Sequence, residues 1–176
     1  MLINSGELER KAILSTAERM CVAARTAPKG KGVDNIVTAV LTDSEKESLA
    51  IEMDKIAQNE GIDFFARDAK NLREAEAVVL IGTKIKTRGI PYCGFCGFGN
   101  CQGKIEHGGV CAFDVGDLGI AIGSAVSIAA DDRVDNRIMF SIGKAALNLN
   151  LLGEDIGIAY GIPLVAKGKS IFFDRK

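Results

Sequence analysis

The chain has 176 residues, 47% of them hydrophobic, so it is long enough to bury a substantial core without disulfides. Its 22 Lys and Arg residues against 23 Asp and Glu residues give a formal net charge of -1, which argues against nucleic-acid binding and against attachment to an anionic membrane surface. The first residues lack the basic-then-apolar order of a signal peptide, and the apolar stretch 115–130 is too short and polar to span a bilayer. We therefore expect a cytoplasmic protein whose thiols stay reduced.

Hydrophobic periodicity predicts alternating helices and strands along the chain. The first helix is expected to be capped by Ser5 and to end before the proline at position 28. A capping-box pattern at Ser44 and Glu47 predicts that the second helix starts at Glu45. In chain order we predict a helix from residue 5, a strand over 36–41, a helix from 45 that ends at Gly61, a helical stretch over 64–74, a strand over 77–82, helices over 117–130 and 136–152, and a last strand over 157–166.

This order of elements predicts an α/β or α+β domain that covers residues 1–176, with a cysteine-rich loop, residues 83–113, inserted after a central strand. The fifth cysteine, Cys21, lies on the apolar face of the first helix and is expected to be a small buried hydrophobic side chain. The other four lie in the loop in the pattern C-x2-C-x4-C-x9-C, at Cys93, Cys96, Cys101 and Cys111.

Three kinds of site explain four clustered cysteines: a disulfide scaffold, a structural zinc site, or an iron–sulfur cluster. A reducing compartment argues against disulfides. A zinc site would use the Cys-x2-Cys pair, and His107, the only histidine, is a candidate to complete a mixed ligand set. A zinc ribbon, however, usually has its second close pair a dozen or more residues further on. A compact triplet followed by one distant cysteine is more typical of an iron–sulfur cluster, with zinc as the alternative metal and His107 as an ordinary loop residue.

The residues between the cysteines fit the iron–sulfur hypothesis. Glycines let the backbone approach a bound group closely and leave peptide N–H groups free to point at sulfur. Phe95 and Phe98 alternate with these glycines and are expected to shield the site from water. Four basic residues flank the cysteines and are expected to offset a negative charge, to form a docking patch for an acidic redox protein, or to be an ordinary basic rim. They are Lys84, Lys86, Arg88 and Lys104.

The loop carries a resemblance to known iron–sulfur proteins. Its sequence C-G-F-C-G-F-G-N-C, followed by a fourth cysteine, resembles the C-G-x-C-G-x-x-x-C four-iron module of corrinoid iron–sulfur proteins and bacterial membrane electron-transport complexes. The gap before Cys111 is shorter than in those proteins. The whole chain, including its ending G-I-P-L-V-A-K-G-K-S-I-F-F-D-R, resembles a family of bacterial and archaeal proteins described as containing a ferredoxin domain. This resemblance implies a [4Fe–4S] cluster and redox work with a partner protein, and it assigns no reaction.

A second resemblance lies outside the loop. Residues 23–35, A-A-R-T-A-P-K-G-K-G-V-D-N, followed by a strand and an acidic helix, are similar to the opening of flavin-dependent nitroreductases. The resemblance implies a nitroreductase-like α+β fold, with a mixed sheet packed with helices, and an interwoven homodimer with FMN at its interface. By position, Lys29 and Asn35 match loop residues near the flavin. Where nitroreductases carry an Arg-x-Ser-x-Arg stretch that grips FMN, this chain offers only Arg10 and Lys11.

Three functional hypotheses follow. The leading one is an iron–sulfur redox protein that transfers electrons through one [4Fe–4S] cluster, with its reaction and catalytic residues unassigned. The second is an FMN-dependent, nitroreductase-like oxidoreductase in which the cluster feeds the flavin. The third is a zinc-stabilised interaction domain without enzymatic activity.

Overall fold

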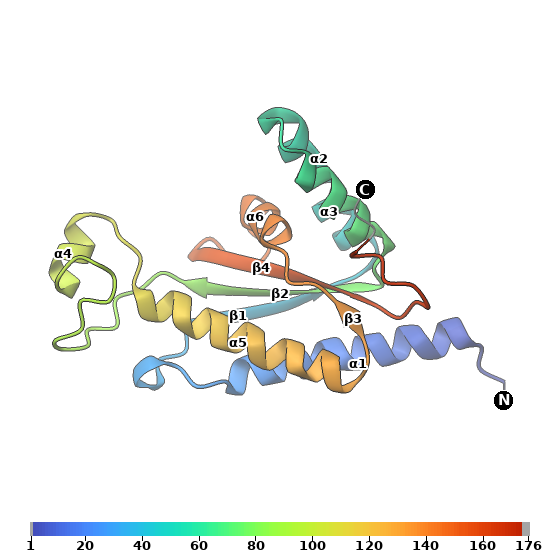
Figure 1. Ribbon diagram of the computed structural model, residues 1–176, viewed down its shortest axis with the longest axis horizontal. Helices are drawn as coiled ribbons and strands as arrows, with labels where there is room; N and C mark the ends of the chain where they lie inside the picture. Colours follow the sequence, from blue (N-terminus) through green and yellow to red (C-terminus); the bar gives the residue numbers. More distant parts are fainter. Residues whose placement is uncertain (1, 174–176) are drawn as a thin grey trace.

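The computed structural model describes residues 2–173 and has one four-stranded sheet between two layers of helices (Figure 1). The strands are β1 (Ile36–Leu41), β2 (Ala77–Lys84), β3 (Asp135–Asn136) and β4 (Ile156–Val165), in the spatial order β1-β2-β4-β3. The helices are α1 (Ser5–Thr26), α2 (Asp43–Glu60), α3 (Asp63–Glu74), α4 (Cys101–Glu106), α5 (Ala112–Asp131) and α6 (Phe140–Asn148). A short 3-10 turn, η1 (Gly30–Gly32), precedes β1. Two residues of the family-like ending, Asp174 and Arg175, lie outside the described residues.

The α+β class is confirmed, but the sheet is not mixed. Every strand pair within residues 2–173 is antiparallel, for example Leu41 opposite Val78 and Ala77 opposite Leu164. The connection from β1 to β2 explains this. A single crossover helix would carry the chain to the far end of the sheet and give parallel strands. Here α2 and α3 pack against each other as a helical hairpin, which returns the chain to the end of the sheet where β1 stopped.

The central strand β2 separates two hydrophobic cores. Because side chains alternate along a strand, Val79 and Ile81 face α1 and α5, whereas Val78 and Leu80 face α2, α3 and α6. The strand residues Ala77–Thr83 are all buried, which is why their sequence is a continuous apolar run rather than an alternating one. The prediction of a buried central strand is therefore confirmed.

The helix starts differ from the predicted ones. Asn4, not Ser5, caps α1: its Oδ1 accepts the Glu7 N–H at 2.9 Å. The predicted capping box at Ser44 and Glu47 is wrong, because α2 already begins at Asp43. Ser44 lies inside the first turn of α2, and the Ser44 hydroxyl donates to Glu45.

The second half of the chain shows larger differences. Helix α5 starts at Ala112, five residues before the predicted start, and α6 starts only at Phe140. Residues 135–136 form β3 instead of the first turn of α6, because they pair with the end of β4. The helix α4 within the cysteine loop was not predicted.

Helix α6 lies unusually close to β4, and Gly143 makes this approach possible. A Cβ atom at position 143 would lie only 1.8 Å from the backbone oxygen of Ala159, so any side chain there would push the helix away from the strand. The sequence pattern of α6 marks its apolar face but not this close contact.

A buried hydrogen bond joins α6 to α3. The Ser141 hydroxyl donates to Asp68 Oδ2 at 2.6 Å, and both side chains are buried. We expect Ser141→Ala to lower the free energy of unfolding by about 1–3 kcal/mol, because it leaves one oxygen of a buried carboxylate without this donor. Urea denaturation would measure the loss. Ser127→Ala, at an exposed position of α5, is the control and should change stability by less than about 0.5 kcal/mol.

The stretch 115–130 was expected to be too short and too polar to span a bilayer, but α5, which contains it, is by length and composition apolar enough to cross a membrane. In the structure it packs along α1 and against β2, and it contributes Leu118, Ala121 and Ala125 to the core on that face. Two carboxylates in its first two turns, Asp114 and Asp117, are buried in ion pairs within the chain. These contacts are those of a core helix of a globular domain.

Candidate functional site

The cysteine loop projects beyond the end of the sheet, between β2 and α5 (Figure 1). Its backbone turns sharply, with positive φ angles at Gly94, Gly97 and Gly99 that residues with a side chain rarely adopt. Within residues 2–173, neither hydrophobic core includes a residue of the loop 83–113. The loop is therefore built onto a domain whose cores are complete without it.

The four loop cysteines line one cavity of about 450 Å³. Cys93, Cys96 and Cys101 are partly exposed, and Cys101 is the first residue of α4. Cys111 is buried and forms the N-cap of α5, where the positive end of the helix dipole favours negative charge. The structure thus brings all four predicted ligands to the wall of one cavity. None of the chain's five cysteines, all within the described residues, is paired in a disulfide.

The four thiols of this cavity are a donor set that a zinc ion or an iron–sulfur cluster could use. A zinc site holds all four ligands around a single ion, with Zn–S distances of about 2.3 Å. Among residues 2–173, no three His, Cys, Asp or Glu side chains converge closely enough to hold a single ion. An iron–sulfur cluster of four irons binds its cysteines at separate iron atoms, so it needs thiols spread around a cavity. Four thiols are donors that either group accepts, and the preference for a cluster rests on the spacing of the cysteines along the chain.

The histidine lies apart from this cavity. The His107 ring stacks on Phe98 with ring centres 5.5 Å apart, and His107 Nδ1 lies 2.8 Å from the backbone oxygen of Gly103. His107 ends α4 and is exposed. The structure agrees with a loop residue and does not place His107 among the cavity-lining side chains.

The two loop phenylalanines do not shield the cysteines as expected. Phe98 packs beside His107, and Phe95 is 77% exposed. The Phe95 ring stacks on Phe113 of α5, with centres 6.0 Å apart and planes 9° apart. Neither Phe95 nor Phe98 belongs to the wall of the cysteine cavity.

The four basic residues flanking the cysteines do not form a surface patch. Lys84 is paired with Asp155 at 2.7 Å, and the pair holds the pKa of the Asp155 carboxyl below its usual range. Arg88 and Lys104 are buried and line the cysteine cavity. Arg88 and Lys104 could not contribute to a docking patch for an acidic protein, whereas Lys86 is exposed, and such a patch stays a prediction.

Arg88 lies at the centre of a buried ion cluster. Its Nη2 is 2.6 Å from Asp117 Oδ2 and 3.1 Å from Asp114 Oδ1, and both carboxylates are on the first two turns of α5. The side chains of Arg88, Asp114 and Asp117 are at most 5% exposed. This cluster fixes the start of the cysteine loop against the helix that carries Cys111.

The same carboxylates hold the loop before β1. Asp117 accepts the backbone N–H of Gly30 at 3.0 Å, and Asp114 accepts the side-chain amide of Asn35 at 3.2 Å. Asp114 also accepts the backbone N–H of Lys86 at 2.7 Å. Loop 29–35, α5 and the entry to the cysteine loop therefore share one hydrogen-bond network.

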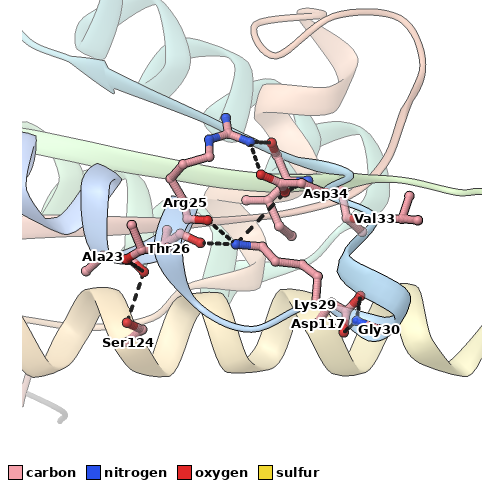
Figure 2. A network of polar contacts seen from close by, with 12 residues as sticks. Ala23, Arg25, Thr26, Lys29, Gly30, Val33, Asp34, Asp117 and Ser124 are labelled. Carbon is pink, nitrogen blue, oxygen red and sulfur yellow. Dashed lines mark hydrogen bonds and ion pairs between the residues drawn. The ribbon is translucent and has the colours of Figure 1, made fainter.

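The two flavin candidates have their polar groups engaged within the chain. Lys29 Nζ donates to the backbone oxygens of Ala24, at 2.7 Å, and of Arg25, at the end of α1, and it lies 4.0 Å from Asp34 (Figure 2). Burial lowers the pKa of Lys29, and the Asp34 carboxylate opposes this shift. Asn35 is bound to Asp114. The structure does not direct the two side chains toward a common ligand, and their role at a flavin stays a prediction.

A second cavity, of about 390 Å³, adjoins the first. Ala112 and Phe113 belong to the walls of both. The second cavity is mostly apolar, and its remaining lining residues are Pro28, Lys29, Gly30, Phe95, Gly116, Asp117 and Ile120. It therefore brings the loop before β1 next to the cysteine loop, as a flavin or substrate site beside a cluster would require.

Sequence reasoning missed the acidic residues of this region. Asp114 and Asp117 are one turn apart at the start of an otherwise apolar helix. Carboxylates on an apolar helix need buried partners, and this was the signal that could have located the ion cluster.

Comparison with known families identifies the second half of the chain. A family model described as an uncharacterized protein containing a ferredoxin domain matches residues 107–175, a range that includes Cys111 but not the other three loop cysteines. A protein of Archaeoglobus fulgidus, itself described as uncharacterized, is 40% identical over 184 residues, which cover 99% of this chain and 98% of that protein.

Comparison with solved structures identifies the fold. An FMN-dependent nitroreductase from Mycobacterium smegmatis, solved in complex with NADPH, has a TM-score of 0.59 and 13% identity over 88% of this chain and 78% of its own. A nitroreductase from Lactococcus lactis, in complex with nicotinic acid, has a TM-score of 0.60 and 12% identity. The match covers 98% of this chain and 86% of the nitroreductase chain. A BluB-like flavoprotein from Clostridium difficile has a TM-score of 0.59 and 17% identity. The match covers 97% of this chain and 86% of the flavoprotein chain. The nitroreductase-like fold is confirmed, and at these identities the likeness shows the fold alone.

Proposed function

The chain belongs to the family described as containing a ferredoxin domain, and from this premise we propose that it is an iron–sulfur redox protein. One [4Fe–4S] cluster, held by the thiolates of Cys93, Cys96, Cys101 and Cys111, would supply single-electron chemistry when bound. The observation that carries the proposal is that all four cysteines line one cavity. We propose that the chain acts as one domain in which residues 83–113 are the cluster-binding insertion.

The chain's own residues support this role. The loop glycines allow the turns that bring Cys93, Cys96 and Cys101 to one side of the cavity, and α5 brings Cys111 to another. The ion cluster around Arg88 holds these two parts together. We also propose that the protein is cytoplasmic, because a thiolate-held cluster needs its cysteines reduced.

Metal analysis tests the proposal directly. The full chain is purified without oxygen, and iron, acid-labile sulfide and zinc are measured per chain, together with the EPR spectrum after dithionite reduction. We expect about four irons and four sulfides per chain and a reduced-state signal. Stoichiometric zinc without iron would instead establish the zinc-stabilised alternative.

A second function, an FMN-dependent nitroreductase-like oxidoreductase, is favoured by the cavity that adjoins the cysteines. The position of this cavity beside Phe113, which also lines the cysteine cavity, would allow electrons to pass between a cluster and a flavin. Its charged lining residues, Lys29 and Asp117, are both bound within the chain and offer no free cation for a phosphate. Flavin released on denaturation, or saturable FMN binding in a fluorescence titration, would support this function. A colourless cluster-free protein that does not bind added FMN would count against it.

We also propose that the protein forms a homodimer through α5. The solvent-facing side of this helix carries no charge from Val115 to Ala130, and nothing lies within 4 Å of a Cβ built at Gly116, Gly119 or Gly123. Small residues allow another helix to approach closely, and Val115 and Ile120 add exposed apolar surface.

Sedimentation equilibrium provides the test of this interface. We expect the wild-type chain to be dimeric and Ile120→Lys to shift it to monomer, because the substitution places a charge in the contact. Ile51→Lys, which introduces the same charge at an exposed position of α2, should leave the dimer intact. A wild-type monomer, or a dimer unaffected by Ile120→Lys, would contradict the α5 interface.

A redox partner protein is proposed to dock on the rim of the cysteine loop. Tyr92, Phe95 and Ile105 are exposed there, whereas Arg88 and Lys104 are buried. We therefore propose an apolar docking surface, which predicts that electron exchange with the partner depends only weakly on ionic strength.

A further inference from the structure

We infer that Lys104 is the counter-charge of the group bound among the four cysteines, and that it raises the reduction potential of that group. The inference rests on the proposed function. It assigns a tuning role to one residue of the loop, beyond the ligands themselves.

The position of Lys104 is the first observation. Lys104 follows Cys101 by three residues on α4, so the two side chains share one face of this short helix. Both line the cysteine cavity. Lys104 is only 8% exposed, although lysine is among the residues least often buried.

The contacts of Lys104 are the second observation. Its Nζ lies 3.4 Å from the backbone oxygen of Lys86 and 3.3 Å from the hydroxyl of Thr87, both long for hydrogen bonds. Among residues 2–173 it forms no ion pair with a carboxylate. A buried ammonium group without an anion is unfavourable, so its burial points to a negative charge that the chain's carboxylates do not supply.

Arg88 shows why Lys104 is the relevant cation. The Arg88 guanidinium is also buried at the cavity, but Asp114 and Asp117 already neutralise it. Its Nε has no hydrogen-bond partner in the described part of the chain. The cavity wall thus presents one uncompensated cation, on Lys104. This feature fits an anionic occupant.

The effect on the potential follows from charge. Four thiolates make the bound cluster anionic, and reduction adds a further negative charge. A nearby cation stabilises the reduced form more than the oxidised form, because the attraction grows with the charge. Lys104 therefore makes reduction easier.

Redox titration of matched variants tests the inference. Lys104→Met removes the charge and keeps most of the side-chain volume, Lys104→Gln keeps a polar group if the first variant folds poorly, and Lys104→Arg keeps the charge. Lys70→Met, at an exposed position of α3, is the control. We expect the EPR-monitored midpoint to become more negative in Lys104→Met and Lys104→Gln. It should move less in Lys104→Arg and stay unchanged in Lys70→Met.

Cluster-free protein gives an independent readout. Without the anion, Lys104 is a buried cation with no counter-charge, so Lys104→Met is expected to raise the melting temperature of chelator-treated protein but not of the loaded protein. An unchanged midpoint in a fully loaded Lys104→Met variant would overturn the inference and leave the proposed function standing. A wild-type chain that takes up no iron would overturn both.

Discussion

Replacing Cys111 with serine is expected to reduce the iron content from about four atoms per chain to about three or fewer, because the iron without a thiolate ligand would be lost first. This substitution tests the ligand whose spacing departs from the related four-iron modules, because the gap before Cys111 is shorter than in those proteins. In the structure Cys111 is the buried member of the set, at the N-terminus of α5. Iron and sulfide analysis after anaerobic reconstitution measures the effect.

Cys21→Ser is the matched control for this experiment. Cys21 lies on α1, half-buried against the core and far along the chain from the loop, and burial raises the pKa of its thiol above the usual value. We expect this variant to bind iron as the wild type does. Full iron retention in Cys111→Ser, with loss in Cys93→Ser or Cys96→Ser, would show that the fourth ligand is another group.

Arg88→Met is expected to lower the free energy of unfolding of the cluster-free protein by about 3–5 kcal/mol, because it leaves two buried carboxylates without their cation. Asp114 and Asp117 would retain only the N–H donors of loop 29–35 and of Lys86. Urea denaturation measures the loss. Arg88→Lys, which keeps the charge but not the forked geometry, should lose less.

Arg19→Met is the control for this loss. Arg19 is paired with Asp132 at the surface, with its own side chain 55% exposed, and a surface ion pair contributes only about 0–1 kcal/mol. Equal losses in Arg88→Met and Arg19→Met would contradict the view that the buried ion cluster anchors the cysteine loop.

Local patterns predicted those parts of the fold that bury long apolar surfaces. The continuous run of β2 and the amphipathic face of α1 depend only on nearby residues, so both elements were predicted correctly. The two-residue strand β3 exists because it pairs with the end of β4, and no local pattern records such a pairing. The antiparallel direction of β1 and β2 likewise depends on the packing of α2 against α3, which the residue pattern of a strand does not predict.

The candidate site, like the fold, was predicted from the sequence only in part. Cysteine spacing alone located the four thiols that the structure brings to one cavity. The burial of the basic side chains could not be predicted. The sequence shows that Arg88 and Lys104 are basic, but it does not show that the loop turns them inward. Whether a charged side chain is buried depends on partners such as Asp114 and Asp117, which lie on a different element.

The separation of the cysteine loop from both hydrophobic cores has a consequence for the life of the protein in the cell. Since neither hydrophobic core includes a residue of 83–113, we expect the newly made chain to fold whether or not a cluster is bound. If the proposed function holds, cluster loading would then be a late step of maturation on a folded domain. Iron starvation should accordingly leave a pool of folded, unloaded protein that can be filled later, rather than a misfolded chain destined for proteolysis.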